Sequence, residues 1–188
     1  MGEIPLEKDA ISVGVGRGGL KSTAEIKILV LYLLMNVKEP VPSNQIADLL
    51  HIEGIANTFE VNEAFYQLYK NELIDQSEAD PDSYVINEKG WDVGQTLQSS
   101  VPFTVREKSL KLLKKMLQRN RHMKETDIVI SHQDDGTIKV TCSAIENGSV
   151  IMSFSLQAAD DAQAIRIREN YLDDPATVYR ALIDMLTK

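Results

Sequence analysis

The amino-acid sequence predicts an α+β protein made of two small domains, and two patterns carry this prediction. Residues 22–103 place apolar side chains at three- and four-residue spacings and end in a pair of short strand-like segments. Residues 137–144 and 150–156 alternate apolar and polar side chains with a period of two. The first spacing is typical of amphipathic helices, and the second of half-buried strands. We therefore expect one domain at 22–103, and a linker helix followed by a small α+β domain at 104–188.

Residues 1–21 are expected to form a flexible N-terminal arm. Gly14, Gly16 and Gly19 formally satisfy the dinucleotide-binding pattern G-x-G-x-x-G. That pattern requires a strand before it, and only Ile11–Val13 could supply one, next to the charged pair Lys8 and Asp9. Glycine-rich flexibility is the better explanation of this segment.

Three helices joined by short turns are predicted next. Apolar residues from Ile26 to Val37 favour a buried first helix that Pro40 ends. Ser43 can cap a second helix, because its hydroxyl can accept hydrogen bonds from the free amides of a first helical turn. Asn57 or Thr58 can cap a third. The third helix would bury Val61, Ala64, Phe65 and Leu68 and expose Asn62, Glu63, Tyr66, Gln67 and Lys70.

A strand, a polar turn and a second strand follow the third helix, at Leu73–Ser77 and Ser83–Asn87. The stretch Tyr84-Val-Ile-Asn-Glu-Lys-Gly90 resembles the Y-x-L-T-x-x-G ending of bacterial winged-helix domains. Asn71-Glu-Leu-Ile74 is placed like the E-G-L-I that closes the recognition helix in those domains. The spacing of the two pieces makes 22–103 similar to a winged helix-turn-helix domain.

The whole chain also resembles a small bacterial family, domain of unknown function 4364. Membership would imply a winged-helix regulator with an uncharacterised C-terminal part, and it would not supply a ligand.

The C-terminal half is predicted to contain a linker helix, a three-stranded antiparallel meander and two further helices. The linker helix runs from Thr104 to about Arg121, and the strands turn at Asp135-Gly136 and Asn147-Gly148, which tolerate positive φ. Cys142 falls on the inward phase of the middle strand. On the third strand the inward phase comprises Val150, Met152, Phe154 and Leu156. Asp160 can cap the first C-terminal helix, and Asp174-Pro175 starts the second.

Charge is distributed unevenly along the chain, whose formal net charge is −8. Residues 1–103 carry 7 basic and 16 acidic side chains, residues 104–125 carry 8 and 2, and residues 126–188 carry 5 and 10. This balance argues against a nonspecific nucleic-acid coat, which depends on neutralising phosphates. The basic residues of the linker helix form one stripe at helical spacing: Lys108, Lys111, Lys115 and Arg119. The stripe could contact phosphates, or it could be a solvated face or pair with the acidic N-terminal domain.

A DNA-binding surface is predicted on the second and third helices, helped by this stripe. Free amides at the start of the second helix could hold a phosphate, and polar side chains of the third could contact base edges. Two acidic residues at the third helix, Glu60 and Glu63, and an acidic turn at 78–82 oppose this prediction. The candidate DNA-binding residues are Ser43, Asn44, Gln45, Asn57, Thr58, Asn62, Tyr66, Gln67 and Lys89, together with Lys108, Lys111, Lys115 and Arg119.

Nothing in the sequence assembles a catalytic or metal site. The three histidines lie far apart, and the single cysteine, Cys142, is better explained as a buried apolar residue than as a redox sensor. The longest apolar run, Ile28–Met35, is far too short to span a bilayer, and no secretory signal is visible. We expect a cytoplasmic, homodimeric transcriptional regulator that binds double-stranded DNA without a cofactor. The alternative is a protein-interaction module that has a winged-helix fold but does not bind DNA.

Overall fold

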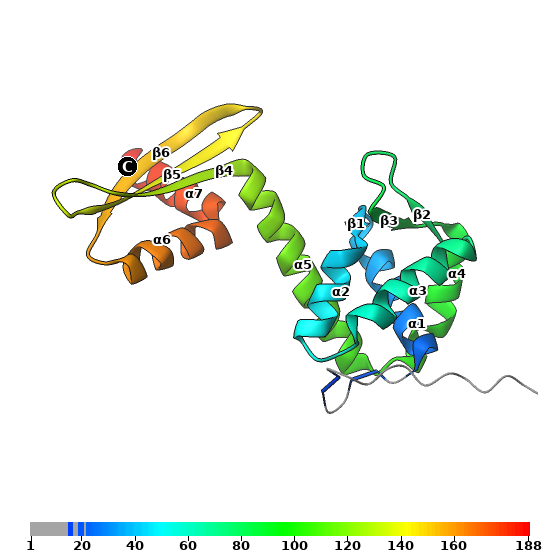
Figure 1. The fold of residues 1–188 in the computed structure, drawn as a ribbon. Coiled ribbons are helices and arrows are strands. Elements are labelled where there is room, and N and C mark those ends of the chain that lie inside the picture. The colour runs from blue at the N-terminus through cyan, green and yellow to red at the C-terminus, as the bar shows by residue number, and fades with distance from the viewer. Residues whose placement is uncertain (1–14, 17–18, 21) are drawn as a thin grey trace, which may run out of the picture. The chain divides into compact units, whose positions relative to one another are not determined.

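The computed structural model describes residues 15–16, 19–20 and 22–188. They form a mixed α+β protein that contains, within this part of the chain, seven α-helices and two three-stranded antiparallel sheets (Figure 1). The chain divides into two compact units, Met1–Lys114 and Lys115–Lys188. The division falls inside a helix that was predicted to belong whole to the second domain. Most of the predicted N-terminal arm lies outside the described residues.

The first unit is built around a central helix. Helix α1 (Thr23–Val37) buries a continuous run of residues, Leu29–Met35, so it is apolar on nearly every side. Ser22 caps it by accepting a hydrogen bond from the amide of Ala24, and Lys38 ends it in a left-handed conformation with φ 56°. The other elements of this unit are β1 (Val41–Pro42), α2 (Ser43–Ile52), α3 (Thr58–Lys70), β2 (Ile74–Gln76), β3 (Ser83–Ile86), α4 (Glu88–Leu97), a 3-10 turn (Gln98–Ser100) and the start of α5 (Phe103–Glu125).

The sheet of the first unit has the order β1-β3-β2. The predicted hairpin is present, with Ile74 opposite Ile86. The short strand β1, which was not predicted, pairs with the other side of β3 through Val41 and Tyr84. This pairing ties the hairpin to the start of α2.

Of the two helix caps predicted for the first unit, the one at Asn57 is confirmed. Asn57 caps α3 by accepting from the amide of Phe59 at 2.8 Å, and Asn87 caps α4 by accepting from the amide of Gly90 at 3.0 Å. The predicted cap at Ser43 is wrong. Pro42 occupies the cap position without a side-chain bond, and Ser43 is the first residue of α2. Its amide donates to the carbonyl of Asp82 at 3.0 Å instead.

Gly90, the last residue of the winged-helix-like stretch, lies against the backbone before β2. A Cβ atom at this position would lie 1.9 Å from the carbonyl oxygen of Leu73 and 3.0 Å from Cγ1 of Ile86. The first turn of α4 can therefore pack beside the hairpin only because residue 90 has no side chain.

The second unit contains the end of α5 and a three-stranded sheet with the order β4-β5-β6. As predicted, the strands are joined by two tight turns, in which Gly136, Asn147 and Gly148 have positive φ. Cys142 is buried in the core of this unit, also as predicted. The elements are β4 (Thr126–His132), β5 (Ile138–Glu146), β6 (Ser149–Ala158), α6 (Asp161–Asp173) and α7 (Pro175–Leu186).

Of the four residues that the alternation placed on the inward face of the third strand, two pack against the core. Met152 and Phe154 pack against the core around Cys142, but Val150 is 61% exposed and Leu156 is 46% exposed. Val150 lies beyond a register shift between Ala144 and Ile145 on the neighbouring strand. Leu156 lies on the same face as Val140, but β6 is the outer strand of its sheet, so one side of it has no neighbouring strand among the described residues.

Candidate nucleic-acid interface

Helix α3 presents a solvent-facing stripe that is rich in aromatic residues. Phe59 is 63% exposed and Tyr66 is 57% exposed, and Asn62 lies between them in the sequence and is also exposed. Their spacings of three and four residues place them on one side of the helix. Tyr66 therefore faces outward, as expected, and Lys70 Nζ lies 6.0 Å from the centre of its ring.

Tyr69 extends this stripe. Its side chain is 45% exposed, and its ring meets that of Tyr84 edge-on at a centroid distance of 6.0 Å. Phe65 packs on the other part of the same Tyr84 ring at 5.3 Å. The hairpin thus holds α3 through one tyrosine, which leaves part of Tyr69 accessible.

The two carboxylates that opposed DNA binding do not lie freely on the outer face of α3. Glu60 is only 8% exposed, and it accepts a hydrogen bond from the Thr23 hydroxyl on α1 at 3.3 Å. Glu63 accepts from Nε2 of Gln67 at 2.7 Å, and Oε1 of Gln67 accepts from Nζ of Lys27 at 3.2 Å. The repulsion expected from Glu60 is therefore weaker than the sequence suggested, and Gln67 is engaged with α1.

The remaining polar candidates of the first unit lie at helix starts. Ser43, Asn44 and Gln45 form the first turn of α2, and Asn44 is exposed. Asn57 and Thr58 are half-buried at the start of α3, where Asn57 serves as the cap. Asn44 is thus the most accessible of these five side chains.

The hairpin tip is acidic and locally ordered. Asp80 accepts hydrogen bonds from the Ser83 hydroxyl at 2.6 Å and from the amide of Asp82 at 3.1 Å. These bonds, the hydroxyl first, hold the pKa of Asp80 below its usual range, so it stays ionised. A hairpin with this charge repels phosphate rather than gripping it.

Lys89, the candidate cation next to the hairpin, forms an ion pair. Its Nζ lies 2.8 Å from Oε2 of Glu72. The hydrogen bond and the opposite charge lower the pKa of Glu72 and raise that of Lys89. The two charges balance each other at the surface.

The predicted basic stripe is divided by its partners. In the first unit, Lys108 Nζ lies 2.8 Å from Oε2 of Glu53, while Lys111 is exposed. In the second unit, Lys115 is exposed, while Arg119 forms ion pairs with Glu169 and Asp173. Lys111 and Lys115 are therefore the members of the stripe best placed to meet an external anion.

The aromatic character of this surface was not predicted. Phe59 was not among the candidates, although its spacing from Asn62 and Tyr66 was the signal that could have identified it.

A family model described as domain of unknown function (DUF4364) matches residues 26–186. The chain belongs to this family. The match includes most of both compact units, so the DUF4364 domain is not confined to the first unit. No curated protein and no solved structure matches the chain.

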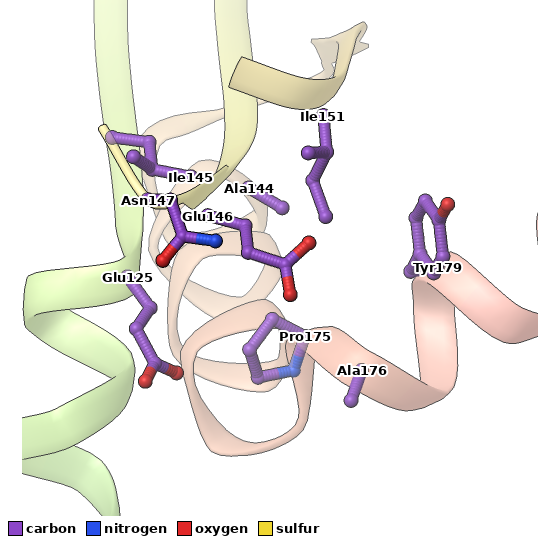
Figure 2. A pocket seen from close by; sticks show the side chains of 9 residues that line it. All are labelled: Glu125, Ala144, Ile145, Glu146, Asn147, Ile151, Pro175, Ala176 and Tyr179. Carbon is purple, nitrogen blue, oxygen red and sulfur yellow. The ribbon is translucent and has the colours of Figure 1, made fainter. Parts of the chain in front are cut away.

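The C-terminal unit of this DUF4364 protein has an open cleft of about 560 Å³. Its lining comes from the end of α5, the β5–β6 hairpin and the first turns of α7 (Figure 2). Ile145, Ile151 and Tyr179 supply apolar surface, and the exposed residues Glu125 and Glu146 also line the cleft. Such a cleft is compatible with contact to an apolar group, and it contains no cationic side chain for binding phosphate.

The part of the chain that the structure describes contains neither a candidate metal site nor a candidate membrane-spanning helix. There, no three His, Cys, Asp or Glu side chains come together in a way that could hold a metal ion. Across the same residues, none of the helices combines the length and apolar character needed to cross a bilayer.

Proposed function

We propose that this protein is a DNA-binding transcriptional regulator whose first unit acts as a winged helix. The observation that carries the proposal is the exposed face of α3, where Asn62, Tyr66 and Lys70 extend into solvent. In winged-helix proteins, the second helix of the helix-turn-helix enters the major groove. Asparagine can form a bidentate pair with adenine there, and tyrosine and lysine can reach phosphates.

The order of elements supports the assignment of α3 as the recognition helix. Helices α2 and α3 pack together and are joined by a short turn, and the β2–β3 hairpin follows α3 directly. Strand β1 adds a third strand to the hairpin, and Gly90 allows close packing behind it. In this proposal the hairpin is the wing.

The negative charge of the first unit limits how the exposed face of α3 can bind DNA. Residues 22–103 carry 4 basic and 13 acidic side chains, and the hairpin tip is acidic. Base contacts from α3 would therefore need phosphate contacts from elsewhere, and the exposed lysines of α5, Lys111 and Lys115, are the proposed source. Burial of Glu60 removes one repulsive charge from the protein–DNA contact.

The test is selection of bound sequences from random double-stranded DNA by the purified full chain, followed by titration of a selected sequence at several salt concentrations. We expect sequence-selective binding that weakens as salt rises. Asn62→Ala should cost about 1–3 kcal/mol of discrimination at one base position. Lys111→Glu with Lys115→Glu should weaken binding to all sequences and reduce the salt dependence.

A charge-matched control separates these lysines from a general effect of charge. Arg166→Glu with Lys188→Glu reverses two exposed cations on α6 and at the C-terminus, and binding should change little. Failure to enrich any sequence at low salt would overturn the proposal. Equal loss of affinity in both double variants would overturn the role of α5.

A second function, protein recognition by the same face, is favoured by the aromatic stripe. Phe59, Tyr66 and Tyr69 are all at least 45% exposed on an acidic unit. Exposed aromatic residues are typical anchors of protein interfaces. This function predicts a stable protein partner that is lost on Phe59→Ser, together with no DNA affinity at low salt.

A further inference from the structure

The outer strand of the second unit is an unprotected sheet edge. Strand β6 pairs with β5 on one side, and none of the described strands pairs with its other side (Figure 1). It is ten residues long, Ser149–Ala158, and contains neither a charged residue nor proline. Monomeric proteins usually protect such edges with charges, proline or short strands, because free backbone groups otherwise pair with another chain.

The opposite edge of the same sheet differs in length and in charge. Strand β4 is shorter, with seven residues, and carries the exposed Asp127 near its start. At its end, Nε2 of His132 lies 2.8 Å from Oδ1 of Asp161 on α6. Charged side chains therefore flank β4, and β6 has none.

The second unit also leaves much apolar surface uncovered. Eight of its apolar side chains are buried: Leu117, Ile138, Val140, Cys142, Ala158, Ala164, Tyr171 and Leu172. Nine large ones are exposed: Met123, Val129, Val150, Ile151, Leu156, Ile165, Ile183, Met185 and Leu186. A unit of this size buries little surface by itself, and exposed apolar surface on this scale marks an interaction site. Three of the nine belong to β6.

The side chains of β6 match those of a second β6 when the two strands run antiparallel. The register with β5 places Met152, Phe154 and Leu156 on one face of the sheet and Ser153 and Ser155 on the other. Identical antiparallel strands related by a two-fold axis bring together residues whose numbers add up to a constant. When this sum is even, an even-numbered residue lies opposite an even-numbered one and an odd-numbered residue opposite an odd-numbered one. Apolar residues of one copy then meet apolar residues of the other, and serines meet serines.

Charge does not oppose this pairing. Two-fold symmetry would place any charge on β6 close to its own copy, and the strand has none. On the neighbouring strand, Lys139 pairs with Gln157, and Glu146 pairs with Ser149 at the other end. Antiparallel pairing would bring the Lys139 end of one copy towards the Glu146 end of the other.

We propose that the partner of this edge is a second copy of the chain, joined through antiparallel β6–β6 pairing. The β4-β5-β6 sheets of the two copies become one six-stranded sheet. Leu156 of each copy packs against the apolar face of the other copy's sheet. The interface lies wholly in the second unit, so it goes beyond the proposed DNA binding and does not depend on it. It would supply the two-fold symmetry that paired DNA half-sites require.

The test is sedimentation equilibrium of the full chain without DNA over a wide range of concentrations. The wild type should be a dimer. Leu156→Lys and Val150→Lys each put two positive charges at the interface, and they should raise the dissociation constant about tenfold or more. Val129→Lys is the matched control, because Val129 is 49% exposed on β4, the other edge of the same sheet, and it should leave the dimer intact.

Hydrogen exchange supplies a second measurement that does not depend on a variant. The outward-facing amides of β6 should exchange slowly in the dimer and faster on dilution, whereas the amides of β5 should exchange at the same rate in both conditions. A wild-type monomer at all concentrations would overturn the proposal, and so would a foreign protein bound at β6 of a monomer. A dimer that both β6 variants leave intact, or that Val129→Lys weakens equally, would overturn it as well.

Discussion

Gly90→Ala should destabilise the first unit, although alanine is the better helix former. The added Cβ would lie 1.9 Å from the carbonyl oxygen of Leu73, and uncharged carbon and oxygen atoms do not approach closer than about 3 Å. The backbone at Leu73 would therefore have to move by about 1 Å. This carbonyl also accepts the amide of Asn87 at 3.4 Å, and the next residue, Ile74, is fully buried in β2. The movement would thus disturb both the hairpin and the cap of α4.

The magnitude follows from opposing contributions. Overpacking of this kind costs about 1–3 kcal/mol, and the upper half of that range applies because the obstacle is backbone rather than a flexible side chain. Loss of the long Asn87–Leu73 bond adds at most about 1 kcal/mol. The helical preference of alanine over glycine recovers about 0.5–1 kcal/mol. The free energy of unfolding should fall by about 2 kcal/mol, which lowers the melting temperature of a unit this size by about 8 °C.

Urea unfolding followed by the fluorescence of Trp91 measures this change. Trp91 is the only tryptophan in the chain and lies in α4, so it reports on the first unit alone. Gly94→Ala is the control in the same helix, because its Cβ would meet Cβ of Leu31 at 3.5 Å, an ordinary contact. Gly94→Ala should raise stability by about 0.5–1 kcal/mol. Two changes of the same sign would refute the reasoning.

Four further predictions concern single side chains. Tyr171 is 3% exposed and its hydroxyl has no hydrogen-bond partner, so Tyr171→Phe should leave stability equal or raise it by up to about 1 kcal/mol in thermal unfolding. By contrast, Tyr32→Phe should lower it by about 1 kcal/mol, because that hydroxyl donates to a carboxylate at 2.6 Å. Burial removes Cys142 from solvent and raises the pKa of its thiol, so a thiol reagent at neutral pH should modify it only after unfolding. Finally, Lys89→Gln should raise the pKa of Glu72 towards its usual value in an NMR titration. Since that pKa is lowered in the native protein, the stabilisation from the pair should be present above the ordinary carboxyl pKa and disappear as the pH falls through the lowered one.

Most elements were predictable because their signals are local. A cap such as Asn57, a turn such as Asn147-Gly148 and a periodic apolar run each act on residues a few positions away. Strand β1 escaped prediction because two residues carry no periodicity, and Val41 forms a strand only because β3 lies beside it. The exposure of Val150 and Leu156 escaped prediction for a related reason, since alternation reveals neither a register shift nor which strand lies at the edge of a sheet.

The candidate site was less predictable than the elements that carry it. The sequence placed Glu60 and Gln67 on the third helix correctly, but not their partners. Thr23 and Lys27 lie about forty positions earlier, and the packing of α1 against α3 brings them within hydrogen-bond distance. The exposed aromatic stripe likewise depends on which side of α3 the other helices cover.

The sequence by itself determined that this chain is an α+β member of its family, in what order its helices and longer strands follow, and where its charge is concentrated. Tertiary structure alone decided which charges stay accessible, why residue 90 must be glycine, and which strand edge is left open. The reason is that secondary structure depends mainly on neighbours along the chain. Exposure, close approach and ion pairing instead depend on residues that only folding brings together.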